Sequence, residues 1–141
     1  MSFLLDTNVL SEWTKPHPNR GLVAWLDAAD EDDLFVSAVT FAELAYGVER
    51  LPAGRRRRRL ESWLQHDLAM RFETRILAVD EAVAAAWGRV VVQRERLGRP
   101  IGIMDAFIAA TASVHHLTLV TRNAADFTPT LADLVNPWRS A

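Results

Sequence analysis

Short apolar runs alternate along the chain with longer segments of helical periodicity. Runs such as FLL and LFVS are typical of strands that are covered on both faces of a parallel sheet. We predict strands at residues 3–5, 34–37, 76–80 and 117–121, with an edge strand near 134–135. Because strands and helices alternate, the pattern predicts an α/β fold with a parallel sheet.

The segments between these strands predict helices. After the second strand, apolar residues recur at helical spacing from position 39 to position 48, and Ser37 or Thr40 can cap this helix. A later helix is expected to close at Gly98, since glycine tolerates the left-handed end of a helix and Pro100 prevents its continuation. The predicted helices cover residues 8–14, 22–26, 38–51, 54–72, 81–98 and 103–116, the last of them buried, and residues 121–127 are expected to form an exposed loop.

Acidic side chains are predicted to gather at one edge of this sheet. Asp6 directly follows the first strand, and Asp126 lies just past the strand at 117–121. Ligands of open parallel sheets bind beyond the carboxyl ends of the strands. A crossover helix runs antiparallel to the strands, so the helices that carry Glu43 and Asp105 begin at the same edge. We therefore expect these four acids to converge from four separate segments.

Such a convergence of carboxylates requires a compensating charge. Carboxylates within about 4–6 Å of one another resist ionisation, and the roughly 0.3–1 kcal/mol that a helix N-terminus supplies is too little to offset this. Mg²⁺ or Mn²⁺ fits better, because both ions prefer oxygen ligands. Taken alone, Asp6 or Asp105 is explained equally well as a helix cap. Glu43 is less easily explained, since it lies among apolar residues in a helix expected to be largely buried.

The composition narrows the class of protein further. A chain of 141 residues suits a single domain, residues 1–141. No apolar run approaches the roughly 20 residues of a membrane span, and no signal peptide is recognisable, so we expect a cytoplasmic protein without a membrane partner. Because the chain has no cysteine, a metal must take oxygen or imidazole ligands.

Four motifs in order resemble the PIN-domain family. They are DTN at 6–8 after an apolar strand, TFAEL with Glu43, IMDAFIAATA with Asp105, and VTRNAADF near the end. Their order and spacing are most similar to the VapC and FitB ribonuclease toxins of bacterial toxin–antitoxin pairs, and NPW at 136–138 is closest to the FitB branch. The resemblance covers essentially the whole chain and implies a three-layer α/β/α PIN-like domain with a short central parallel sheet.

The resemblance also implies a function. It implies a metal-dependent endoribonuclease, the toxin of a type II pair, inhibited by a cognate antitoxin that links it to operator DNA, and a homodimer. Mg²⁺ or Mn²⁺ would be bound by Asp6, Glu43 and Asp105. At the fourth position some relatives have an acid where this chain has Asn123, and others have the TRNxxDF form seen here, so either Asn123 or Asp126 completes the site.

Neighbouring polar residues are expected to support the acids. Thr7 and Thr121 could orient a ligating carboxylate or water, and Asn8 would hydrogen-bond a neighbouring acid. Arg122 would bind a phosphate bidentately or pair with one of the acids. The five consecutive arginines at 55–59 would contact RNA or the antitoxin, or form a solvated surface.

Two other interpretations remain open. The protein could be a catalytically weak module that acts mainly through an antitoxin complex on operator DNA. It could also be a metal phosphohydrolase for small molecules, which predicts a deep enclosed pocket in place of an open acidic groove. The acidic segment 30–33 is expected to be a solvated helix end, and Trp63 and Trp87 are candidates for a dimer interface.

Overall fold

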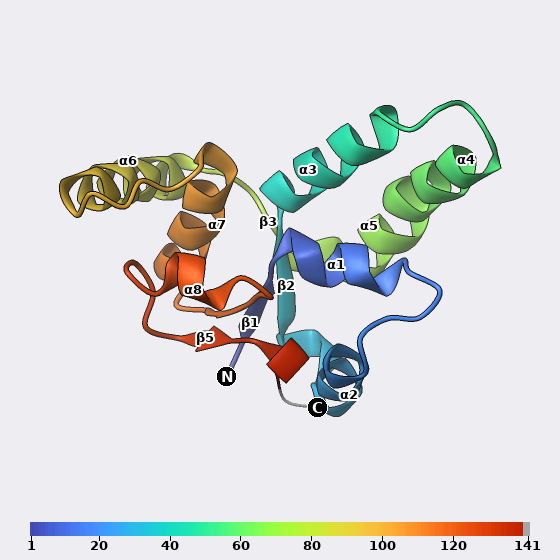
Figure 1. Cartoon of the computed structure of the whole chain (residues 1–141), viewed down its shortest axis with the longest axis horizontal. Coiled ribbons are helices and arrows are strands. Elements are labelled where there is room, and N and C mark those ends of the chain that lie inside the picture. The colour runs from blue at the N-terminus through green and yellow to red at the C-terminus, as the bar shows by residue number, and fades with distance from the viewer. Residues whose placement is uncertain (140–141) are drawn as a thin grey trace.

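The centre of the molecule is a parallel sheet of five strands in the order β3-β2-β1-β4-β5 (Figure 1). The structure is a computed structural model, and it describes residues 1–139. The strands are β1 (Phe3–Leu5), β2 (Leu34–Ser37), β3 (Ile76–Leu77), β4 (Thr118–Val120) and β5 (Leu134–Val135). The predicted α/β fold with a parallel sheet is confirmed, including the edge strand.

Eight α-helices connect these strands within the described residues. They are α1 (Thr7–Trp13), α2 (Arg20–Ala28), α3 (Ala38–Glu49), α4 (Arg55–Ser62), α5 (Ala69–Phe72), α6 (Glu81–Arg96), α7 (Ile103–Val114) and α8 (Ala124–Phe127). A π-helical segment, Trp63–Leu68, joins α4 to α5, so the helix predicted at 54–72 is almost continuous. Gly98 ends α6 with φ +68, as predicted, and Ser37 is the residue that caps α3.

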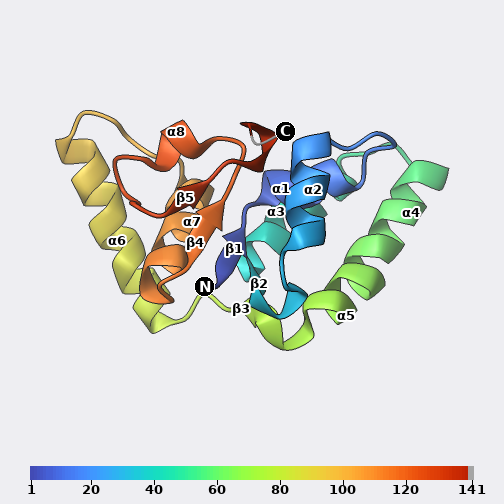
Figure 2. The same ribbon diagram turned by 90° about the horizontal axis from the view of Figure 1, so that it is seen from below.

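Helices cover both faces of the sheet, which explains why its strands are continuously apolar (Figure 2). Successive strand residues point to opposite faces. Leu5 and Val120 belong to one buried cluster, which α1, α2 and α5 complete. Leu4 and Leu119 belong to the other, which α6, α7 and α8 complete. The three-layer arrangement is therefore confirmed.

Several predicted elements differ from the structure. The strand predicted at 76–80 ends at Leu77, because the Asp80 side chain accepts a hydrogen bond from the Val83 N–H at 2.9 Å and begins α6 instead. The loop predicted at 121–127 contains α8, which forms because Phe127 is buried. Helix α3 was predicted to be largely buried, but only Val39, Thr40 and Val48 are buried in it.

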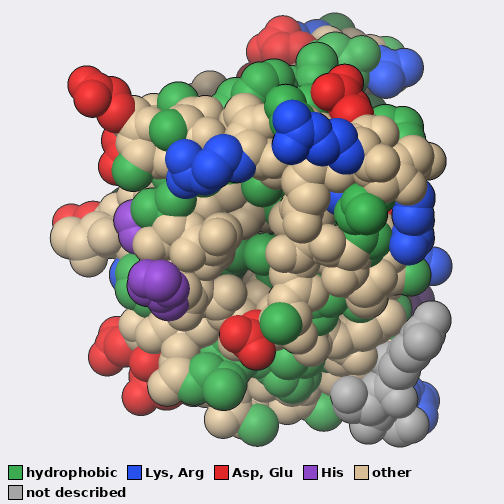
Figure 3. All heavy atoms as spheres, turned by 90° about the vertical axis from the view of Figure 1, so that its left-hand side faces the viewer, with side chains coloured by type: hydrophobic (Ala, Val, Ile, Leu, Met, Phe, Trp, Pro, Cys, Tyr) green, Lys and Arg blue, Asp and Glu red, His purple; other side chains and the backbone are tan. Residues whose placement is uncertain are grey.

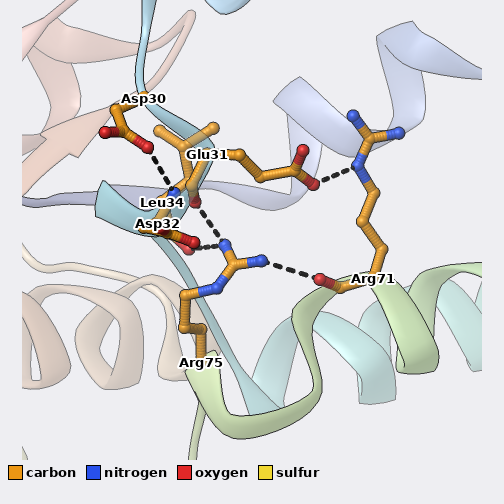
Figure 4. A network of polar contacts seen from close by, with 6 residues as sticks. All are labelled: Asp30, Glu31, Asp32, Leu34, Arg71 and Arg75. Atoms are coloured by element: carbon orange, nitrogen blue, oxygen red, sulfur yellow. Dashed lines mark hydrogen bonds and ion pairs between the residues drawn. The ribbon is translucent and has the colours of Figure 1, made fainter.

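The acidic segment that follows α2 is held by two arginines (Figure 4). Glu31 accepts a hydrogen bond from Arg71 Nε at 2.7 Å. Arg75 donates to the carbonyl oxygens of Glu31 and Leu34, which fixes the entry into β2. Residues 30–33 are largely exposed, as predicted, but they form a separate 3₁₀ turn, Glu31–Asp33, and not the end of α2. No helix within residues 1–139 is long and apolar enough to cross a membrane.

Candidate active site

Asp6 lies at the carboxyl end of β1 and is only 5% exposed. Its backbone N–H donates to the Val120 carbonyl at 3.0 Å, which anchors it between β1 and β4. Its Oδ1 accepts the Thr7 N–H at 2.8 Å, so Asp6 caps α1. Its Oδ2 accepts hydrogen bonds from Thr121 Oγ at 2.8 Å and Asn8 Nδ2 at 3.3 Å. Asp6 is therefore both a cap and a fully oriented carboxylate.

The environment of Asp6 opposes its ionisation. Burial is the main reason that its pKa is raised from 3.8 to about 6. The hydrogen bonds from Thr121 and Thr7 lower the pKa, whereas the nearby charges of Asp105 and Glu43 raise it. The charged form of Asp6 at neutral pH is consequently maintained against both burial and repulsion.

Glu43 reaches the same place from the second turn of α3. Its Oε1 accepts a hydrogen bond from Thr7 Oγ at 2.7 Å, and Thr7 Oγ lies 3.1 Å from Thr40 Oγ. Thr7 thus contributes its N–H to one acid and its hydroxyl to another, so a single residue fixes the positions of both carboxylates.

Asp105 occupies the first turn of α7, whose N-cap residue is Gly102. Its carboxylate accepts no hydrogen bond from residues 1–139, so it does not cap the helix. Its pKa is raised, mainly by burial and also by Glu43 and Asp126, while Arg94 lowers it. The alternative explanation of Asp105 as a helix cap therefore lacks support.

These three acids line one pocket of about 370 Å³ that is open to solvent. Asn123 also lines it, whereas Asp126 is exposed, lies outside the lining and acts on Asp105 through its charge. The structure thus brings Asp6, Glu43, Asp105 and Asn123 together and leaves Asp126 at the margin.

The predicted supporting residues form a hydrogen-bonded chain behind the acids. Thr121 Oγ accepts the Asn123 N–H at 3.1 Å while it donates to Asp6. Asn8 donates to Asp6, as expected, and its Oδ1 accepts the Arg122 N–H at 3.2 Å. The Arg122 side chain lines the pocket and forms no ion pair with any acid of the described residues.

The sequence prediction did not include Glu12, a fourth acid that lines the pocket. It is 7% exposed and accepts hydrogen bonds from Lys15 Nζ at 2.9 Å and the Asn19 N–H at 3.0 Å. The hydrogen bond from Lys15 is the main reason that the pKa of Glu12 is lowered. Asn8 and Glu12 lie four residues apart and so share one face of α1, and this spacing is the signal that could have placed Glu12 beside the site.

The site has the donor chemistry of a hard divalent cation. Within residues 1–139, no three His, Asp or Glu side chains are arranged so that they could hold a metal ion together as they stand. All available donors are nevertheless oxygens, and burial, with a smaller contribution from repulsion among the acids, raises the pKa of Asp6 and of Asp105. Mg²⁺ keeps several waters and commonly takes one or two carboxylates directly, so these residues fit it.

Comparison with known proteins agrees with this geometry. A PIN domain model matches residues 3–128. The chain is 41% identical to the toxin FitB of Neisseria gonorrhoeae, across 96% of this chain and 97% of that protein. It is 36% identical to the VapC ribonuclease Y4jK of Sinorhizobium fredii, across 98% and 99%.

The structure of the chain is also similar to solved structures of relatives. A solved structure of FitAB bound to a DNA fragment has a TM-score of 0.91 and 38% identity, and the match covers 97% of this chain and 96% of that one. The chain therefore belongs to the PIN-domain family, with FitB and VapC toxins among its relatives.

Proposed function

We propose that residues 1–141 form a single PIN domain that acts as a metal-dependent endoribonuclease, the toxin of a type II toxin–antitoxin pair. The observation that carries this proposal is the convergence of Asp6, Glu43 and Asp105 on one pocket, where none of the three forms an ion pair within residues 1–139. The relatives named toxin and ribonuclease support it.

Mg²⁺ or Mn²⁺ would be held by Asp6 and Asp105, with Glu43 as a further ligand, directly or through water. Such an ion neutralises charge on the phosphate and lowers the pKa of an attacking water. The requirement for a metal ion goes beyond the family assignment, because the names of the relatives specify no metal.

The chain's own residues hold and move the remaining groups. Thr121 and the Thr7 N–H fix Asp6, and the Thr7 hydroxyl fixes Glu43, whose free oxygen can accept the proton of the attacking water. The guanidinium of Arg122 is free to donate to a phosphate oxygen. Asn123 lines the same pocket and can donate to the substrate or to bound water.

The shape of the pocket supports a polymeric substrate. A phosphohydrolase for small molecules predicts a deep enclosed pocket, whereas this one opens to solvent and continues along the surface. A nuclease must admit a strand that extends on both sides of the scissile phosphate, and an open pocket allows this.

We further infer a cognate antitoxin that covers the pocket, contact with operator DNA through that antitoxin, a cytoplasmic location and a homodimer. The FitAB structure bound to DNA supports the first two. The two tryptophans suggested for a dimer interface already have contacts within their own chain. Trp87 stacks on Phe107 with ring centroids 5.3 Å apart, and Trp63 packs against the core, so each could offer only part of its surface to a second copy.

The test is cleavage of single-stranded RNA by the purified chain with Mg²⁺, with Mn²⁺ and with EDTA. We expect cleavage with either metal, none with EDTA, and a loss of more than about 100-fold for Asp105→Asn, because the ligand is removed. Asp32→Asn, an exposed acid outside the pocket, is the matched control and should cut like wild type. Absence of activity in wild type, or equal activity in Asp105→Asn, would favour the non-catalytic module instead.

A further inference from the structure

Two hollows continue the acidic pocket over the surface between α1 and α4, and we call them together the α1–α4 groove. The first, of about 320 Å³, shares Thr7, Ser11, Lys15 and Glu43 with the pocket. The second, of about 400 Å³, shares Thr14, Leu60 and Trp63 with the first. A strand bound at the acids can therefore pass from one hollow to the next without leaving the groove.

The groove has apolar walls and a basic rim. Leu60 and Trp63 line both hollows. Arg56 lines the first hollow together with Lys15, which is paired with Glu12. Arg59 lines the second hollow together with Asp67. Residues three apart on a helix share a face, so Arg56 and Arg59 both reach the groove from α4. Neither forms an ion pair with an acid in the part of the chain that the structure describes.

The central arginine of the run has a different role. Arg57 bonds Glu61 through Nε and Glu49 through Nη2, both at 2.8 Å, and donates to the Leu51 carbonyl at 3.3 Å. It therefore ties α4 to the end of α3 and is not available to a ligand. The run divides into one structural arginine, two that line the groove, and Arg55 and Arg58, which are exposed and line neither hollow.

The opposite side of the molecule also has a hollow lined by apolar and basic residues, but this hollow is separate from the acidic pocket. There α6 carries a hollow of about 720 Å³ that includes Arg89 and Arg96 but shares no lining residue with the acidic pocket. Figure 3 views this side, and basic, acidic and hydrophobic side chains are interspersed on it. Basic charge that is continuous with the pocket is therefore a property of the α1–α4 groove.

We propose that the α1–α4 groove binds the single-stranded RNA next to the scissile phosphate, with bases against Leu60 and Trp63 and phosphates at Arg56 and Arg59. The proposal rests on the proposed function, which places the scissile phosphate at the acids. Unpaired strands bind where an aromatic or apolar surface adjoins a basic track, because every base has a face that can stack and every phosphate is anionic. The bases of an A-form duplex are paired and stacked, so they cannot enter such hollows one by one.

The test measures how binding of a short labelled single-stranded RNA depends on salt, by fluorescence anisotropy with the full chain in EDTA. The double variant Arg56→Gln/Arg59→Gln is compared with Arg55→Gln/Arg58→Gln, which removes the same charge from the same helix. For single strands each phosphate contact contributes about 0.7 to the slope of log K against log salt, so the groove pair should lower the slope by about 1.4. The control pair should leave it at the wild-type value.

Equal slopes for the two pairs would overturn the proposal, since they would show either no contact or only general attraction by the charge of α4. An unchanged RNA slope with weakened binding of an antitoxin peptide would also overturn it and assign the groove to a protein. Circular dichroism verifies that both variants are folded. Because the assay needs no cleavage, a chain that binds RNA through the groove but cuts none refutes the proposed function alone. A chain that cuts RNA with equal slopes refutes the groove alone.

Discussion

The acids on the two walls of the pocket lie in opposite electrostatic environments. On the wall built from β1, α3 and α7, Asp6, Glu43 and Asp105 face one another, and no lysine or arginine forms an ion pair with them in the described part of the chain. On the wall built from α1, Glu12 accepts a hydrogen bond from Lys15 at 2.9 Å. Asp6 and Glu12 both have little exposed surface, at 5% and 7%, but burial is the main influence on Asp6 and raises its pKa, whereas the hydrogen bond from Lys15 is the main influence on Glu12 and lowers its pKa.

This difference separates two kinds of buried acid. Glu12 has its countercharge within the chain, so it is stable as an anion and can serve the fold. Asp6 and Asp105 form no ion pair within residues 1–139, so burial and mutual repulsion disfavour their ionised forms, and a cation from outside would stabilise both. Burial alone therefore does not identify a ligand, whereas burial without a countercharge does point to one.

The largest expected effect is on the pH dependence of stability without metal. The folded-state pKa of Asp6 is raised to about 6, so protonation favours the folded state. Stability from this group is full below the unfolded pKa and is lost as pH rises through about 6. A rise from 3.8 to about 6 corresponds to about 3 kcal/mol. In EDTA, wild type should lose this much unfolding free energy relative to Asp6→Asn between about pH 3 and pH 7, measured by urea denaturation.

Saturating Mg²⁺ should restore the lost stability at pH 7 in wild type but much less in Asp6→Asn, because an ion that binds only the folded state stabilises it. A constant stability difference between the two proteins across this pH range would mean that the pKa of Asp6 is the same in the folded and unfolded states. The comparison of the two walls would then fail.

A smaller effect is expected for Thr121→Val, which keeps the shape of a fully buried side chain but removes its hydroxyl. That hydroxyl donates to Asp6 and accepts the Asn123 N–H. Residues that orient a metal ligand typically contribute about 10–100-fold, so we expect RNA cleavage to fall within this range and to recover in part at higher Mg²⁺. Thr118→Val, at the start of the strand β4 that Thr121 directly follows, is the control, since the Thr118 hydroxyl makes no hydrogen bond within residues 1–139. Equal losses in the two variants would indicate a general effect on β4.

The convergence of Asp6, Glu43 and Asp105 was predictable because topology determines it, whereas Asp126, which was predicted to join them, lies outside the pocket lining. Strands that are apolar on both faces imply a parallel sheet with helices on each side, and Leu4 and Leu5 do face different layers. Once the sheet is parallel, Asp6 and the first turns of the helices that carry Glu43 and Asp105 must lie at one edge. No side-chain geometry enters this inference.

The remainder depended on side-chain directions and on packing between distant segments. Glu12 reaches the pocket because of the rotation of α1 about its axis, and the apolar pattern of such a short helix determines that rotation poorly. Trp138 lines the pocket only because the turn at Pro137–Arg139 packs near α2, a contact between the two ends of the chain. The exposure of α3 could not be read from its apolar residues, since surfaces also carry many of them.

The smallest expected effect is the one that tests the second wall, and it comes from Glu12→Gln. The variant can still accept the Asn19 N–H but loses the charge that Lys15 neutralises. Since Lys15 is half exposed, we expect a loss of about 1 kcal/mol at pH 7 by urea denaturation. Because the pKa of Glu12 is lowered in the folded state, this loss should disappear as pH falls through that pKa. Cleavage and stabilisation by Mg²⁺ should match those of Glu95→Gln, an exposed control on α6. If Glu12→Gln instead weakened Mg²⁺ binding as Asp105→Asn does, Glu12 would belong with the acids that need an external cation.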